Sequence, residues 1–92
     1  MELVDAAAIT DALATLHWER DGNELVKVVR KYDFRGALSY VNDVGRLAEE
    51  AGHHPDIDIR YNRVRLALTT HDAGGLTQKD FQMARRIDSL AG

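Results

Sequence analysis

The chain contains no cysteine, only one proline and no long run of apolar residues. Without cysteine there can be no disulfide framework and no thiolate nucleophile. No segment is long and apolar enough to cross a membrane as a helix. The first residues, MELVDAAAITDALATL, carry acids where a secretory signal needs a basic start and an unbroken apolar run. We therefore expect a cytoplasmic protein without membrane contact.

Concentrated positive charge is also missing. The formal net charge is −3, and no block of lysines and arginines stands out. Nucleic acid as the main partner normally requires a basic face, so we expect none. The 92 residues predict one domain over 1–92. A domain of this size buries only about 60–65% of its unfolded surface, so a homodimer or homotetramer would be a natural way to bury more.

The hydrophobic periodicity predicts three helices and four strands. We expect a helix over 5–16, a β-hairpin that turns at 20–23 and ends near Tyr32, a helix over 34–51, strands over 56–61 and 63–70, and a last helix capped by Thr77. Helix and strand pairs in the order α-β-β-α-β-β-α are typical of an α+β fold. The sequence thus predicts a four-stranded antiparallel sheet with helices packed on one face.

The helix over 34–51 has an unusually wide apolar face, which covers about half of its circumference. Gly52 follows it at the position of a C-terminal cap. A wide apolar face is found on helices seated deeply within one monomer. It is also found on helices that contact both their own sheet and a second subunit, and the sequence leaves both interpretations open.

The register of the second hairpin can be predicted from burial, because a slip by one residue turns every side chain to the opposite face. The register that keeps the apolar residues together pairs Tyr61 with Val64, Ile59 with Leu66 and Ile57 with Leu68. Continued outward, it places His54 opposite His71, where paired Cβ atoms lie about 5 Å apart. Strand geometry thus predicts that these two distant histidines are neighbours.

His53 is expected to join them from the preceding helix. Glu49 stands four residues earlier, so its carboxylate can reach the imidazole and fix its tautomer if the last helical turn persists. Purely structural interpretations remain open for the two carboxylates. Glu49 can be an ordinary solvated helix residue, and Asp80 can serve only in a capping box with Thr77, three positions before it.

Clustered imidazoles suggest either a metal site or proton transfer. Neighbouring strand residues point to opposite faces, which disfavours one ion held by both His53 and His54, and no cysteine is available as a ligand. No serine stands on a tight turn beside the histidines, which disfavours a nucleophilic triad. Proton transfer near neutral pH suits the imidazole group, so we predict acid/base chemistry without a metal.

The spacing of these residues resembles a known signature. Glu49, three residues, His53-His54-Pro55, five residues, Tyr61, nine residues, His71, eight residues and Asp80 together resemble the pterin-4a-carbinolamine dehydratase family. The likeness continues in TTHDAGGLTQKD and in Trp18 before the first turn, and the predicted element order fits the whole chain. One departure is Ile57, where many relatives carry tryptophan, which changes the expected rim of the pocket.

The resemblance implies a reaction, the dehydration of 4a-hydroxytetrahydropterin to quinonoid dihydropterin and water. This step regenerates the pterin cofactor after hydroxylation of aromatic amino acids, and it requires no metal or organic cofactor. The substrate loses hydroxide from carbon 4a and a proton from nitrogen 5, which fits an acid and a base acting together.

The resemblance also implies roles for individual residues. His53 and His71 become the acid/base pair, and His54 a catalytic residue that binds or orients the substrate. Glu49 would orient His53, Asp80 would support the loop around His71, and Trp18 and Thr70 would bind the pterin. For Trp18, an ordinary place in the core is the alternative interpretation.

A second hypothesis belongs to another class of function. Animal members of this family also act as dimerisation cofactors for a transcription factor, through a helix surface like that of 34–51. A non-catalytic scaffold of this kind does not need its histidines. Because this chain keeps His53, His54 and His71, we favour the enzyme over the scaffold.

Overall fold

Three α-helices and four β-strands follow one another in the predicted order. The computed structural model describes residues 2–90, and its elements are α1 (Ala6–Leu13), β1 (Glu19–Asp21), β2 (Glu24–Arg30), α2 (Phe34–Ala51), β3 (Asp56–Arg60), β4 (Arg63–Leu68), a short 3-10 helix (His71–Ala73) and α3 (Gln78–Asp88). The 3-10 helix was not predicted. Both strands of the second hairpin are shorter than expected.

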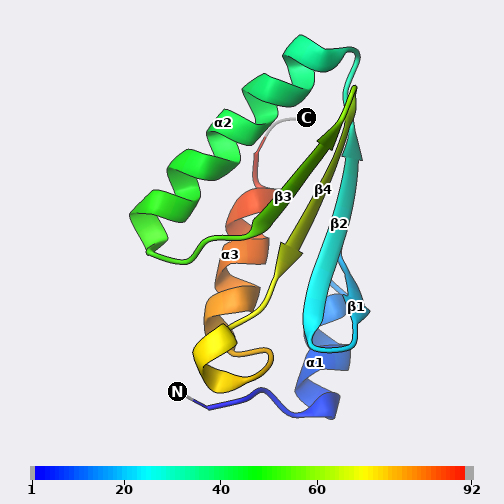
Figure 1. Cartoon of the computed structure of the whole chain (residues 1–92). Coiled ribbons are helices and arrows are strands. Elements are labelled where there is room, and N and C mark those ends of the chain that lie inside the picture. Colours follow the sequence, from blue (N-terminus) through cyan, green and yellow to red (C-terminus); the bar gives the residue numbers. More distant parts are fainter. Residues whose placement is uncertain (1, 91–92) are drawn as a thin grey trace.

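The strands form one antiparallel sheet in the order β1-β2-β4-β3. Because β4 pairs with β2, the chain runs through α2 and the outer strand β3 before it returns to the centre of the sheet. The long helices α2 and α3 lie on one face of the sheet (Figure 1). This arrangement confirms the predicted α+β class.

Local signals in the sequence fix where the helices begin and end. The side chains of Asp5 and Asp33 accept hydrogen bonds from the backbone N–H groups of Ala8 and Gly36, at 2.9 and 2.8 Å, and so cap α1 and α2. Gly52 ends α2 in the left-handed conformation, with φ of 63°. This reversal directs the chain from α2 straight into the adjacent histidines.

The core lies between the sheet and the helices. Its strand residues are Leu25, Val64, Leu66 and Leu68, and its helix residues include Ile9, Ala37, Tyr40, Val44, Ala48, Phe81, Met83, Ala84 and Ile87. These side chains come from all three helices and the two central strands. The edge strand β3 adds only the partly buried Ile59, which leaves much of its surface free.

The predicted register of the second hairpin is wrong by two residues. Ile59 pairs with Val64 and Ile57 with Leu66, because Tyr61 lies in the turn rather than in the strand. Tyr61 has a φ of 51°, a left-handed conformation that the hydrophobic pattern does not reveal. The shift keeps every side chain on its predicted face, since two residues are one full strand period.

Candidate active site

Two separate segments bring the histidines to one pocket of about 300 Å³, which we call the histidine pocket. His53 and His54 follow the end of α2, and His71 begins the 3-10 helix after β4. The walls of the pocket include His53, His54, Thr70, His71, Asp72 and Lys79. The predicted gathering of the imidazoles is thus found, although His54 and His71 are not directly opposed: the observed register, continued outward, places His54 opposite Thr69.

His53 is held by a buried carboxylate. Its Nε2 lies 2.6 Å from Oδ1 of Asp80, whose side chain is 0% exposed. The other oxygen of Asp80 accepts hydrogen bonds from the Thr70 hydroxyl at 2.8 Å and from the Thr77 N–H at 2.9 Å. An ionised carboxylate that already accepts two hydrogen bonds takes a third as an acceptor, so His53 carries its proton on Nε2. Its Nδ1 remains available to a substrate.

Asp80 therefore has two functions. It is the last of the four residues of the capping box that begins α3 at Thr77, as predicted. It also orients an imidazole, a role that the sequence analysis had given to Glu49. The hydroxyls of Thr70 and Thr77 lie 2.8 Å apart, so the carboxylate sits in a closed network of buried groups. The Thr70 hydroxyl belongs to this network and the residue is only 5% exposed, so its side chain supports Asp80, and its role in binding the pterin stays a prediction.

Glu49 holds the other histidine of the pair. The predicted hydrogen bond from Glu49 to His53 is wrong, because Oε1 of Glu49 lies 2.7 Å from Nε2 of His54. Gly52 reverses the chain after α2, which turns the second histidine rather than the first back towards the helix. Both groups of this pair are exposed, the His54 side chain by 59% and Glu49 by 80%. The pair therefore orients His54 at the surface, where water weakens the bond.

His71 lacks a comparable partner. Within residues 2–90, neither of its ring nitrogens makes a hydrogen bond or ion pair with the protein. Its backbone carbonyl accepts from Gly74 N–H, and Gly74 adopts a φ of 75° that closes the 3-10 helix. The exposed imidazole is thus carried by a fixed backbone, but both of its nitrogens are free to exchange protons with a bound molecule.

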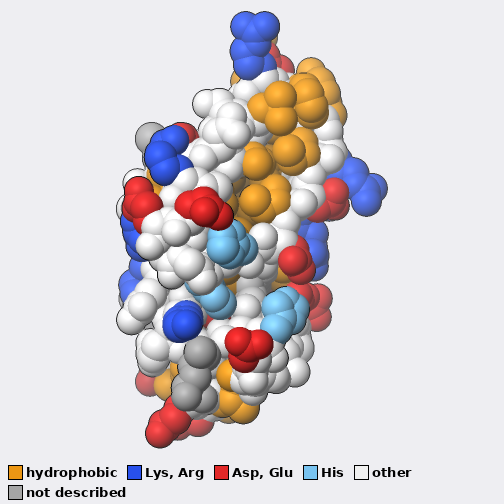
Figure 2. Space-filling view, turned by 60° about the vertical axis from the view of Figure 1, so that its left-hand side comes forward, with side chains coloured by type: hydrophobic (Ala, Val, Ile, Leu, Met, Phe, Trp, Pro, Cys, Tyr) orange, Lys and Arg blue, Asp and Glu red, His pale blue; other side chains and the backbone are white. Residues whose placement is uncertain are grey.

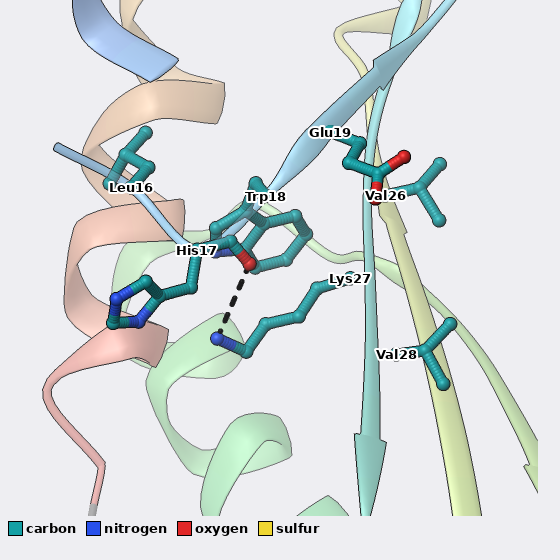
Figure 3. A pocket seen from close by; sticks show the side chains of 7 residues that line it. All are labelled: Leu16, His17, Trp18, Glu19, Val26, Lys27 and Val28. Carbon is teal, nitrogen blue, oxygen red and sulfur yellow. Dashed lines mark hydrogen bonds between the residues drawn. The ribbon is translucent and has the colours of Figure 1, made fainter. Parts of the chain in front are cut away.

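Trp18 does not belong to the histidine pocket. It is 5% exposed within the core, and its Nε1 donates to Oδ1 of Asp88 at 2.8 Å. It lines a different hollow of about 420 Å³ beside the first hairpin, together with His17 and Lys27 (Figure 3). Its predicted role in pterin binding is therefore not supported within one chain, and the alternative interpretation as a core aromatic fits the structure.

The side chains around the Trp18 hollow connect structural elements and do not form a second acid/base site. Lys27 forms an ion pair of 2.7 Å with Asp88. Its Nζ also lies 3.5 Å from the His17 carbonyl oxygen (Figure 3). Burial acts to raise the pKa of Asp88. The hydrogen bond from His17 N–H, the hydrogen bond and charge of Lys27, and the bond from Trp18 outweigh burial and hold that pKa below its usual value. Lys27 and Asp88 thus link β2 to α3.

A second hollow adjoins the histidine pocket at His54. This groove of about 480 Å³ lies between α2 and β3, and we call it the α2–β3 groove. His54 lines both the groove and the histidine pocket. Figure 2 shows the same side of the molecule, with hydrophobic side chains along its upper part and histidines directly below them. The aliphatic surface of the groove is thus continuous with the histidine pocket at His54.

Two residues of the histidine pocket were missed by the sequence analysis. Lys79, in the first turn of α3, and Asp72, in the 3-10 helix, bring opposite charges to its wall. The sequence offered one signal for Lys79, which is its place next to Asp80, a residue already predicted to support the site. Within residues 2–90, no group of three or more histidine, aspartate or glutamate side chains is arranged to hold a metal ion.

The comparison with known families gives the pocket a context. The sequence model of the family described as pterin 4 alpha carbinolamine dehydratase matches residues 2–90. The chain belongs to this family. A pterin-4-alpha-carbinolamine dehydratase of Chloroflexus aurantiacus, a name given provisionally, is 55% identical over 93 residues, which cover 100% of each chain.

Solved structures in and near the pterin dehydratase family share the fold. A crystal structure from Brucella melitensis, described as a transcriptional coactivator/pterin dehydratase, has a TM-score of 0.92 and 29% identity and covers 99% of this chain and 100% of its own. A pterin dehydratase-like protein, described as a RuBisCO assembly factor in the alpha-carboxysome, has a TM-score of 0.66 and 23% identity over 84% of this chain and 89% of its own. In the described part of this family member, no helix is long and apolar enough to span a membrane.

Proposed function

We propose that the chain dehydrates 4a-hydroxytetrahydropterin to quinonoid dihydropterin by histidine acid/base catalysis, as a step of pterin cofactor recycling. The observation that carries this proposal is the pair of oriented imidazoles, His53 on Asp80 and His54 on Glu49, in one pocket with the unpaired His71. Family membership over residues 2–90 supports the substrate class.

The reaction needs one proton delivered and one removed. An acid protonates the hydroxyl on carbon 4a, so that the C–O bond breaks and water leaves. A base takes the proton from nitrogen 5, whose electron pair forms the new C=N bond. We assign these steps to His53 and His71, with His54 binding and orienting the ring, and each positioned group is expected to contribute about 10²- to 10⁴-fold. No metal or organic cofactor takes part in this scheme.

The buried Asp80 supports the assignment of His53 to proton transfer. A carboxylate on the far side of the ring keeps Nε2 protonated and stabilises positive charge that develops on the imidazole. A purely structural protein needs no such arrangement. The two carboxylate–imidazole pairs therefore favour an enzyme over a non-catalytic scaffold.

We further propose that the protein is a homo-oligomer in the cytoplasm. An apolar stripe runs along α2 and onto β3, with Phe34 48%, Leu38 42% and Ile57 38% exposed. The outer edge of β3 has no partner strand within the described residues. A second copy that covers the stripe and this edge would remove both from water, which a domain of this size needs for stability. A dimer and a tetramer both satisfy this requirement.

A dehydratase assay on the wild-type protein tests the proposed activity. Carbinolamine would be generated chemically, and the appearance of the quinonoid product would be followed by absorbance. The uncatalysed dehydration sets the floor and must be subtracted. We expect a large acceleration that is proportional to protein concentration and survives exhaustive treatment with a chelator. Folded protein that leaves the uncatalysed rate unchanged would contradict the proposal.

A further inference from the structure

The outer face of the sheet carries a row of arginines. The long helices cover the other face, where Val64 of β4 is fully buried (Figure 1). Successive side chains of a strand point to opposite faces, so Arg63 and Arg65, on either side of Val64, point outward. In the observed register Arg63 pairs with Arg30 of β2 on one side and with Arg60 of β3 on the other. We call these four arginines the arginine face.

Contacts within the chain do not explain this row. Like charges that lie directly opposite each other destabilise a sheet, and Arg63 has two such neighbours. Within residues 2–90, the side chains of Arg30, Arg63 and Arg65 make no hydrogen bond or ion pair. The one acid of these two rows, Asp58, lies opposite Arg65 and forms an ion pair of 3.4 Å with Arg60, whose side chain is 75% exposed. Such an exposed pair contributes little, so the face keeps positive charge on a chain whose formal net charge is −3.

The arginine face suits a short anionic segment. A guanidinium group binds a carboxylate or a phosphate through two parallel hydrogen bonds, so arginines on neighbouring strands can hold several acidic groups at once. The basic surface ends after two rows of residues. Along the strands the next row holds Asp56 of β3 opposite Ala67, and Glu19 of β1 lies opposite Val26 in the same row. A long polyanion such as a nucleic acid would continue over these acids, which disfavours it as the partner.

Aliphatic side chains adjoin the arginines on the same face. Val28 pairs with Arg65 and is 47% exposed. Figure 3 shows Val26 and Val28 pointing from β2 to the side opposite Lys27, and both valines line the hollow of about 420 Å³ around Trp18. An apolar side chain next to the acidic groups of a partner can therefore contact Val28 and enter this hollow. A peptide supplies such a side chain, whereas a sugar-phosphate backbone does not.

We propose that the arginine face and Val28 bind a short acidic segment of another protein, in which apolar residues adjoin the carboxylates. Arg63 lies at the centre of the contact, and Val28 with the neighbouring hollow receives the apolar side chain. The face lies on the side of the sheet opposite Ile57 and α2, so a second copy on the apolar stripe leaves it open. It also lies beside the turn between β3 and β4, away from the strand ends that carry the histidine pocket. This inference does not depend on the proposed dehydratase activity.

The test measures the binding of two probes to the full chain by fluorescence anisotropy. One is a short synthetic peptide in which glutamates flank a pair of leucines, and the other is an oligothymidylate of similar length and charge, each with an uncharged dye. The wild type should bind the peptide more tightly than the oligothymidylate, and the affinity should fall as the salt concentration rises.

Arg63→Glu reverses the central charge of the face. The dissociation constant of the peptide should rise about tenfold or more, because a hydrogen bond between charged groups contributes at least the free energy of this factor. The fold should be kept, since the change removes the repulsion by Arg30 and Arg60. Arg85→Glu makes the same change of charge at an exposed position of α3 and is the matched control, with a dissociation constant within about twofold of wild type.

Val28→Ser tests the apolar part of the contact. It should raise the dissociation constant of the peptide by roughly 3- to 10-fold and leave that of the oligothymidylate unchanged. Turnover of carbinolamine should be unchanged in Arg63→Glu, which separates this site from the histidine pocket. Folded wild type that does not bind the peptide, tighter binding of the oligothymidylate, or equal losses in Arg63→Glu and Arg85→Glu would overturn the proposal.

Discussion

Replacing Asp80 by asparagine tests how His53 is prepared for proton transfer. The carboxylate accepts three hydrogen bonds while it is fully buried, from His53, Thr70 and the Thr77 N–H. An asparagine keeps only one acceptor oxygen. If that oxygen stays with the two donors at Oδ2, its NH₂ group faces Nε2 of His53. The ring must then carry its proton on Nδ1, which removes the free lone pair from the nitrogen that faces outward.

The size of the effect follows from the bond that is lost. A hydrogen bond to a charged group contributes about 1.5–3 kcal/mol. If this contribution is needed in full during proton transfer, turnover should fall by roughly 10- to 150-fold, since about 1.4 kcal/mol corresponds to a factor of ten. The substitution should also lower the free energy of unfolding, because three hydrogen bonds to a charged carboxylate become weaker bonds to a neutral amide.

Two measurements on Asp80→Asn separate these effects. Turnover is followed with chemically generated carbinolamine, and the tautomer of His53 is read from the ¹⁵N chemical shifts of its ring. Asp88→Asn is the matched control, because it also removes a largely buried carboxylate with several hydrogen bonds, but beside Trp18 rather than in the histidine pocket. It should lower stability and leave turnover unchanged. Folded Asp80→Asn with a changed tautomer and turnover within about twofold of wild type would refute the reasoning.

Three further outcomes are expected. His54→Ala should mainly raise the apparent KM, as its imidazole orients the substrate, whereas His17→Ala should change little; an unchanged KM in the first variant would contradict the assignment. Burial and, second, the charge of Asp88 raise the pKa of Tyr40 from 10.0 to about 12. Between these two pH values the folded chain keeps a proton that the unfolded chain releases. The contribution of Tyr40 to the free energy of unfolding is therefore fully present below pH 10 and is lost as the pH rises through about 12. Urea unfolding measured across this range should show the loss in the wild type and not in Tyr40→Phe. Leu38→Arg should give a monomer by light scattering at micromolar concentration, with the wild type as control, and an unchanged mass would argue against the apolar stripe as the interface.

The order of the elements could be predicted because each carries its own local signal. The apolar face of α2 repeats with the helical period, Asp33 and Gly52 mark its two ends, and the strands alternate. These signals act over a few residues and do not depend on the rest of the chain. They were enough for the α+β class and for bringing His53, His54 and His71 into one region.

The pairings within the site required details that the pattern does not contain. The hairpin register depended on whether Tyr61 belongs to the strand or to the turn, and hydrophobicity favoured the strand although the residue is 66% exposed. Glu49 was assigned to His53 by helical spacing. The left-handed turn at Gly52 breaks that spacing, so the carboxylate meets His54 instead.

Asp80 shows why a correct local prediction can be incomplete. Its place in the capping box was readable from the four residues that begin with Thr77. Its contact with His53, 27 positions away, depends on how α3 packs against the end of α2. The role predicted for Trp18 also depended on tertiary packing, which buries this residue beside Asp88. Nothing in its neighbours along the chain distinguishes a core indole from a ligand-binding one.

The central claim is that His53 and His71 carry the two proton transfers. Turnover of chemically generated carbinolamine should be measured in His53→Ala, His71→Ala and the double variant, after subtraction of the uncatalysed rate and with folding checked by circular dichroism. Each single change should lower turnover by about 10²-fold or more. The double variant should lose less than the product of the two single losses, since both groups serve one transition state. Near-normal turnover in both folded single variants would contradict the account.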